Sequence, residues 1–203
     1  MSGILFTGFA PFGSDTVNGS WEAVRALPDR IGNVTIYKRE LPVVYDRVRD
    51  CLTALLDELR PRAVVCVGQA AGRTAVTPEL VAVNWRSGAI ADNDGIRYDG
   101  VPIDAAGPAA YFSTLPVRAL TEALCAEGIP AYLSLSAGGY VCNSTMYHLL
   151  DLLRGRPGIP AGFVHVPYLS TQAAQRPNVA SLPLATVTAA LECIARRLCA
   201  AEA

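Results

Sequence analysis

The sequence AVVCV at residues 63–67 is an unbroken run of apolar residues. Valine favours strands, and a short run without a polar alternate position is typical of a strand covered on both faces. An amphipathic segment at residues 43–59, which we predict to be a helix, precedes it. A buried strand after a helix indicates an α/β domain whose sheet is largely parallel.

The same alternation of short β-rich runs and helical segments continues through the chain. Further strands are predicted at residues 3–6, 35–41, 80–84, 131–136 and 163–166. Further helices are predicted at residues 20–27, 109–127, 144–154 and 184–201. Neither an internal repeat nor a break in composition divides the chain, so we predict one domain over residues 1–203. One connection, residues 86–108, is long and polar, and a connection of this length in a compact domain is usually functional.

Composition excludes several classes of protein. Charged residues make up 17% of the chain and the net charge is −1, so neither a basic nucleic-acid surface nor an acidic tail is present. The first residues carry no basic segment followed by an apolar one, which a secretory signal requires. No run of about 18 apolar residues could span a bilayer. We therefore expect a cytoplasmic protein.

The six cysteines and two histidines do not form a metal or disulfide pattern. There is no CxxC pair, and the cysteines do not cluster with either histidine. His148 falls inside a predicted helix and is expected on a surface or partner face without a catalytic part. His165 lies near the carboxyl end of a predicted buried strand, where open α/β sheets place their active sites. A histidine satisfied within the core is the alternative for His165.

Cys142 stands in the sequence SAGGYVCN at residues 136–143, where a predicted strand passes through a glycine turn into a helix. A helix amino terminus favours a thiolate, and its free N–H groups can face an oxyanion. A buried core cysteine is the alternative. Cys51 and Cys125 lie within helical segments without such a turn, and the remaining three cysteines occupy apolar strand or helix positions.

Three other segments carry candidate functional residues. The loop GFAPFG at residues 8–13 presents Phe9 and Phe12, with Asn18 nearby; a hydrophobic lid is the alternative. The loop GQAAGR at residues 68–73 includes Gln69 and could hold a phosphate, although its spacing is not GxGxxG. Glu79 directly precedes an apolar strand, and a plain surface carboxylate is the alternative.

Four blocks, in this order, together resemble the pyrrolidone-carboxylate peptidase family, also called pyroglutamyl peptidases of type I. They are TGF with PFG (residues 7–13), GQA with TPE (68–79), AG with VCN (137–143) and HVPY (165–168). The resemblance extends from residue 5 to about residue 172. It implies a three-layer α/β/α sandwich, a homo-oligomer such as a dimer or tetramer, and a catalytic set of Glu79, Cys142 and His165.

By this resemblance the protein is a cysteine peptidase that removes an amino-terminal pyroglutamyl residue from peptides. Cys142 would attack the carbonyl and form an acyl-enzyme, with His165 moving the proton and Glu79 orienting the imidazole. Asp92 competes with Glu79 for that orienting role. We expect no metal or organic cofactor.

Pyroglutamate is a neutral lactam without a free amine, so we expect an apolar slot with a few directed hydrogen bonds. Phe9 and Phe12 suit the faces of the ring, and Gln69 or neighbouring backbone suits its polar atoms, with Asn18 beside them.

The chain departs from its family in two places, one of them after the histidine motif, where LSTQ at residues 169–172 replaces a more usual Pro-Glu pair before the glutamine. The other departure bears on the site. Members usually carry arginine in the stretch after the glutamate, where this chain has Ala89. Arg86, three residues earlier, is the nearest candidate to reach the same space.

Two other functions fit parts of the sequence. A catalytically weak or inactive homologue would bind pyroglutamyl or related peptide ends without turnover, as the absent arginine suggests. A different hydrolase or a nucleoside phosphorylase is suggested only by the two glycine loops. A phosphorylase needs clustered cations, and only Arg73 stands near either loop.

The first prediction concerns the nucleophile. Replacing Cys142 by alanine should abolish hydrolysis of a pyroglutamyl amide, because the acyl-enzyme forms on its sulfur. The matched controls are alanine at Cys51, Cys66, Cys125, Cys193 and Cys199, each of which should retain activity. Stoichiometric labelling of another cysteine with a matching loss of activity would contradict the assignment.

Overall fold

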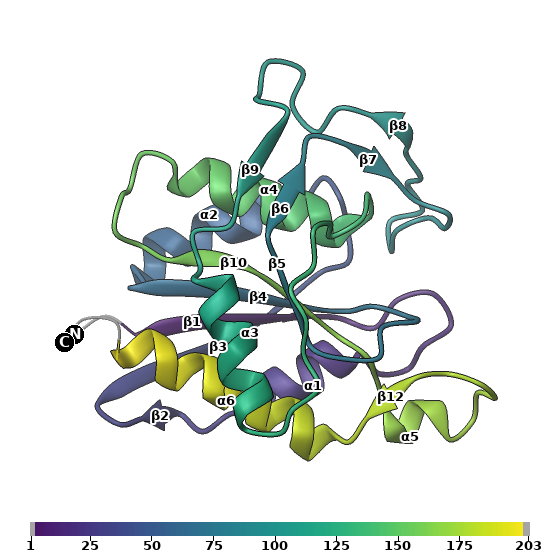
Figure 1. Cartoon of the computed structure of the whole chain (residues 1–203). Coiled ribbons are helices and arrows are strands. Elements are labelled where there is room, and N and C mark those ends of the chain that lie inside the picture. Colours follow the sequence, from purple (N-terminus) through teal and green to yellow (C-terminus); the bar gives the residue numbers. More distant parts are fainter. Residues whose placement is uncertain (1–2, 201–203) are drawn as a thin grey trace.

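The computed structural model describes residues 3–200 and contains a central six-stranded sheet (Figure 1). Its strands are β1 (Ile4–Phe9), β2 (Arg30–Ile31), β3 (Val34–Leu41), β4 (Ala63–Gln69), β5 (Thr77–Glu79) and β10 (Ala161–Val166). The strand order is β2-β3-β1-β4-β10-β5. The four central strands are parallel, whereas β2 and β5 run antiparallel at the two edges.

Helices cover both faces of the sheet (Figure 1). On one face lie α1 (Gly19–Arg25), α3 (Val117–Ala126) and α6 (Leu184–Ala200). On the other lie α2 (Val48–Leu59) and α4 (Val141–Leu153). The predicted α/β/α sandwich with a mostly parallel sheet is therefore confirmed.

The two-sided cover explains the unbroken apolar runs in the sequence. Along β1, Ile4 and Phe6 pack among α1, α3 and α6, whereas Leu5 points to α2 and α4. Along β4, Val65 and Cys66 likewise point to opposite faces, and both are completely buried. Because successive side chains of a strand alternate between faces, every position must be apolar when both faces are covered.

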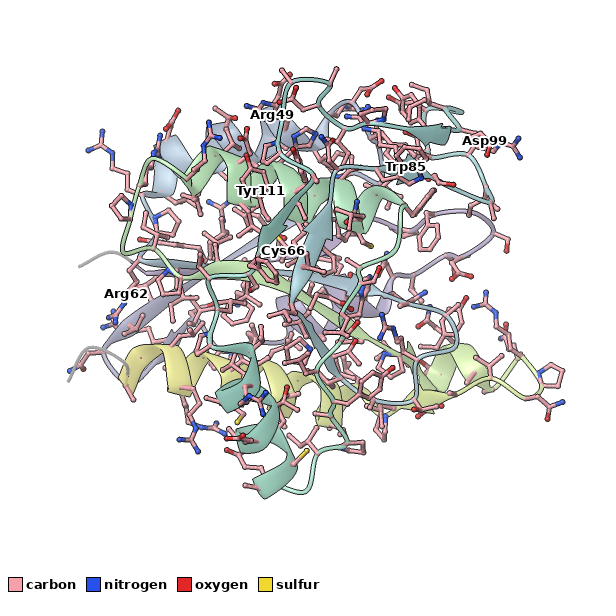
Figure 2. All side chains as sticks on the ribbon, turned by 45° about the horizontal axis from the view of Figure 1, so that its top comes forward. Arg49, Arg62, Cys66, Trp85, Asp99 and Tyr111 are labelled. Atoms are coloured by element: carbon pink, nitrogen blue, oxygen red, sulfur yellow. The ribbon has the colours of Figure 1, made fainter. Side chains whose placement is uncertain are left out.

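Shorter elements surround this framework. An arm extends beyond α4 and contains β6 (Val81–Val83) paired with β9 (Ala110–Phe112), and β7 (Arg86–Ser87) paired with β8 (Asp99–Val101). Figure 2 shows Trp85 and Asp99 on this arm, far from Cys66 in the sheet. Near the carboxyl end of the chain lie β11 (Tyr168–Leu169), α5 (Ser170–Ala173) and β12 (Ser181–Leu182). The long polar connection therefore folds as a small hairpin.

One predicted strand and the first part of one predicted helix are wrong. Residues 131–136 form no strand, and their backbone pairs only in isolated bridges, from Ala131 to Val76 and from Ser134 to Glu79. Residues 109–116 are not helical, because residues 110–112 pair with β6 and the helix begins only after Pro116. The local pattern of each segment fits a strand or a helix, but pairing with residues distant in sequence determines which structure forms.

Other boundaries moved by a few residues. The helix predicted from residue 43 begins at Val48, and the helix predicted from residue 144 begins at Val141. The strand predicted at 80–84 is shorter, and the preceding residues Thr77–Glu79 form the sheet edge instead. Residue 201, predicted to end the last helix, lies outside the described residues.

The end of α2 supports a stability prediction. Arg60 follows the helix in the left-handed conformation, with φ 41°, and its N–H donates to the Leu56 carbonyl. Glycine adopts this conformation without the clash of a Cβ atom, so Arg60→Gly should raise the free energy of unfolding by about 0.5–1 kcal/mol. Denaturant unfolding measures the change.

Asn178 is the matched control, because it also has a positive φ, of 58°. Asparagine tolerates this region better than other side chains do, so Asn178→Gly should change stability less. An Arg60→Gly protein no more stable than the parent would contradict the prediction.

Candidate active site

The carboxyl ends of β4 and β10 bring the candidate residues together. The register of these parallel strands places His165 beside Gly68. His165 and Cys142 line one pocket, together with Gln69, Arg73 and other residues. This is the end of the sheet at which open α/β proteins place their sites.

Cys142 is the second residue of α4. Tyr140 precedes the helix in an extended conformation, and Gly138 before it has φ +80°. At Gly139 a Cβ atom would lie 2.9 Å from the carbonyl oxygen of Ser87, so only glycine fits there. The predicted glycine turn and the thiol at a helix amino terminus are confirmed, although no strand precedes the turn.

The thiol itself lies in tight surroundings. A Cβ atom at Gly68 would lie 2.9 Å from Cys142 Sγ and 2.7 Å from the Phe163 ring. Burial raises the pKa of the Cys142 thiol to about 12, and the Glu79 carboxylate adds to this rise, while a backbone N–H opposes it. The expectation of a favoured thiolate is therefore wrong for the free protein, since loss of water outweighs the helix terminus. The thiol is neutral and needs a base.

His165 and Glu79 form a buried pair. The imidazole Nδ1 lies 2.8 Å from Glu79 Oε1. His165 is 4% exposed to solvent and Glu79 is fully buried. Their strands, β10 and β5, are antiparallel neighbours. Because an ionised carboxylate only accepts, Nδ1 carries the proton and Nε2 keeps its lone pair. The ring is thus prepared to accept a proton through Nε2.

Asp92 does not share this arrangement. Its carboxylate accepts hydrogen bonds from the backbone N–H groups of Tyr45, Asp94 and Ile96, at 2.9 to 3.0 Å. Asp92 therefore organises its own loop, and Glu79 is the carboxylate that faces the histidine.

A narrow slot adjoins the thiol. It is lined by Cys142 and by residues that include Phe9, Phe12, Asn18 and Gln69, as well as Val43, Tyr140 and Val141. The four residues predicted to bind substrate thus meet in one place. The walls are mainly aromatic and aliphatic, as a neutral ring requires.

The two amides in the slot are already engaged. Asn18 caps α1 through Ser20 N and donates to the carbonyl of Ala10. Gln69 Oε1 accepts from Gly19 N at 2.7 Å. Their side chains therefore hold the walls of the slot in place, and neighbouring backbone groups are left to meet a ligand.

Arg86 is directed elsewhere. Its guanidinium lies 2.9 Å from Asp46 Oδ1 and 3.4 Å from His148 Nε2, and it stacks over the Tyr98 ring. It lines neither the slot nor the pocket with Cys142 and His165. The expectation that Arg86 reaches the space of residue 89 is not supported.

His148 is buried on a face of α4 that packs against neighbouring elements, which is the second of the two placements expected for it. Arg49 Nη1 lies 3.2 Å from its Nδ1, while Arg86 approaches the other ring nitrogen. Burial and these two guanidinium groups lower the pKa of His148 to about 4. The sequence placed this residue by its position along the helix, and could not foresee that the arm covers it.

Arg73 is the residue whose position the sequence underrated. It lines the pocket and donates to Glu79 Oε1 at 3.1 Å, so it contacts the carboxylate of the buried pair. Its place in the loop that follows β4, at the carboxyl edge of the sheet, was the available signal.

A thiol at a helix terminus, a histidine and a carboxylate at one end of an α/β/α sandwich define a hydrolase of the cysteine peptidase type. The family model described as pyroglutamyl peptidase matches residues 2–200. The chain belongs to the pyroglutamyl peptidase family.

Similar proteins agree with this assignment. A pyrrolidone-carboxylate peptidase of Klebsiella pneumoniae is 45% identical, covering 95% of this chain and 90% of the relative. One of Gloeobacter violaceus is 44% identical, with 94% of both chains covered. The crystal structure of pyroglutamyl peptidase I from Bacillus amyloliquefaciens matches with a TM-score of 0.94 and 39% identity, covering 99% of this chain and 96% of that one.

The space around Gly68 supports a third prediction. Gly68→Ala would place a methyl group against Cys142 Sγ and Phe163, so kcat/KM for a pyroglutamyl amide should fall about tenfold or more, since small displacements of reacting groups are costly. The overpacked side chain should also cost about 1–3 kcal/mol of stability.

Gly128→Ala is the control, because Gly128 has φ +74° and open space around its Cβ position. This substitution should destabilise the protein through backbone strain while leaving kcat/KM unchanged. A folded Gly68→Ala protein with the parent's kcat/KM would rule out tight packing at the thiol.

Proposed function

We propose that Cys142, His165 and Glu79 act together in this chain to hydrolyse the bond after an amino-terminal pyroglutamyl residue of peptides. The observation that carries the proposal is the 2.8 Å contact between Glu79 and His165, whose ring shares a pocket with the Cys142 thiol. That pocket continues into the apolar slot, since both include Cys142.

The neutral thiol determines the first step. As Sγ attacks the pyroglutamyl carbonyl carbon, Nε2 of His165 takes the thiol proton, so the sulfur becomes nucleophilic only during the attack. The C=O electrons move to oxygen, and N–H groups at the start of α4 face this oxyanion. His165 then returns the proton to the leaving amine, the C–N bond breaks, and a thioester remains on Cys142.

Water completes the cycle. His165 removes a proton from the water that attacks the thioester, and the thiol leaves with a proton as free pyroglutamate forms. In both halves an imidazolium exists briefly beside Glu79. The buried carboxylate stabilises that cation and holds the ring with Nδ1 protonated, which is the role of a third triad member.

The slot accounts for the choice of residue. Phe9 and Phe12 supply apolar surface for the faces of a five-membered ring, and Val43 and Tyr140 extend it. A glutamyl residue with a free amine and carboxylate would lose its hydration there without compensation, which is strongly unfavourable. A neutral lactam avoids that cost.

The other two functions gain no support. A binding protein has no need of a thiol beside a histidine and carboxylate pair. A phosphorylase requires free cations for phosphate, and Arg73 is already paired with Glu79.

We further propose that the protein acts in the cytoplasm and assembles with copies of itself. All six cysteines are free thiols, which suits a reducing compartment.

No helix within residues 3–200 is long and apolar enough to cross a membrane. Light scattering on the purified protein measures the oligomeric state.

A pair of fluorogenic amides tests the activity. The pyroglutamyl amide should be hydrolysed, and the reaction should stop after treatment with iodoacetamide. The prolyl amide is the control, because its ring has the same size but a charged amine and no lactam carbonyl. Equal hydrolysis of both amides, or activity that survives complete alkylation of Cys142, would overturn the proposal.

The fourth prediction concerns residue 89. Ala89 is exposed and follows Gly88, whose Cβ position lies 2.9 Å from the ring of Tyr140, a residue that lines both the slot and the pocket. We propose that an arginine at 89 extends past Tyr140 toward the thiol and assists the oxyanion. Since one such donor contributes about a hundredfold in rate, Ala89→Arg should raise kcat substantially.

Arg86→Ala should change kcat by less than about twofold, because Arg86 is occupied by Asp46 and His148. A fall in kcat and kcat/KM together for Arg86→Ala would show instead that this residue acts in the transition state. If neither substitution alters kcat, position 89 has no part in catalysis.

A further inference from the structure

Arg73 joins three separate parts of the site. Its Nη2 lies 3.1 Å from each of three acceptors, namely Glu79 Oε1, Ser134 Oγ and the carbonyl oxygen of Ser136. Its Nη1 donates to the Tyr132 hydroxyl, also at 3.1 Å. The side chain is 21% exposed, so this network is partly shielded from water.

Glu79 depends on this cation electrostatically. The carboxylate is fully buried, and its Oε2 has no hydrogen-bond partner among the described residues. An uncompensated charge in such a place is very unfavourable, and the carboxyl group takes up a proton instead. Arg73 and His165 both contact Oε1, and the guanidinium of Arg73 supplies a permanent positive charge beside this buried carboxylate.

Arg73 also reaches the chain that leads to the nucleophile. Ser134 and Ser136 precede the glycine turn, which continues into α4 and Cys142. Backbone hydrogen bonds hold the start of this segment beside β5, from Tyr132 N to Val76, from Ser134 N to Pro78 and from Leu80 N to Ser134. Arg73 adds side-chain bonds at Ser134 and Ser136. The Arg73 guanidinium thus connects the Glu79 carboxylate to the segment that leads into α4 and Cys142.

We propose that Arg73 is a positioning residue of the peptidase reaction, which compensates the charge of Glu79 and keeps this carboxylate directed at His165. The inference rests on the proposed roles of Cys142, His165 and Glu79. Arg73 itself touches no reacting atom, because it acts through Glu79 and through the segment before α4.

The sign of the pH effect follows from the charges around Glu79. The titratable and charged groups facing it are His165 on β10, Cys142 on α4 and Arg73, with Tyr132 beyond the guanidinium. Without Arg73, Glu79 gains a proton more readily, and an ionised Glu79 holds the imidazolium more strongly. The active form requires ionised Glu79 and neutral His165, so both effects move the acidic limb of the kcat/KM profile to higher pH.

The experiment compares pH profiles of variants of the full chain. For Arg73→Met, the acidic limb of kcat/KM for the pyroglutamyl amide should move up by about one pH unit or more, because a charge in direct contact is lost. Arg73→Lys keeps the positive charge but loses the planar set of N–H donors. The acidic limb of its kcat/KM profile should therefore stay at the parent's pH, while kcat falls about fivefold or more. Arg156→Met is the control, since Arg156 pairs with Asp57 on an exposed surface and its profile should match the parent's.

Two further measurements separate structure from chemistry. Thermal unfolding establishes that each variant folds, and the pH dependence of Cys142 alkylation by iodoacetamide follows the site without turnover. A folded Arg73→Met protein with an unshifted acidic limb would overturn the inference, as would equal shifts for the Met and Lys variants. If Arg73→Met does not fold, Arg73→Lys decides alone, and a parent-like kcat would refute the positioning role. An inactive parent protein would instead reject the proposed function itself.

Discussion

The pairing of β10 with its two neighbours is the constraint on which the site depends. On one side the parallel register with β4 places His165 beside Gly68, the position that leaves room for the Cys142 sulfur. On the other side the antiparallel β5 brings Glu79 within 2.8 Å of the same imidazole. Strand pairing therefore determines the relative positions of His165 and Glu79, and at Gly68 it leaves the space that the Cys142 sulfur occupies.

Burial of the site affects both the Cys142 thiol and the Glu79 carboxylate. Excluding water raises the pKa of the Cys142 thiol despite its place at the start of α4. The same exclusion makes Glu79 dependent on nearby cations, of which Arg73 is permanent and the imidazolium of His165 is transient. A dry site strengthens each of these interactions, because the effective dielectric constant is low.

Prediction from sequence succeeded where one local pattern has one structural outcome. The apolar runs at β1, β4 and β10 indicated strands covered on both faces, and the glycines before Cys142 indicated a turn into a helix. Prediction failed where the same local pattern is compatible with more than one kind of secondary structure. Residues 131–136 combine apolar side chains with Ser134 and Ser136 and indicated a strand, yet they form only isolated bridges beside β5. Residues 110–112 pair with β6 instead of extending α3.

The sequence by itself determined the fold class, the family and the identity of the residues that meet at the site, because strand periodicity and motif order are local properties of the chain. Only the tertiary structure decided their relations. Glu79 and not Asp92 faces His165, Arg86 turns to Asp46 and His148, and Arg73 joins the buried carboxylate. Such contacts join residues up to 86 positions apart, and their choice depends on strand register and on the competition of each charged group for partners in a space without water.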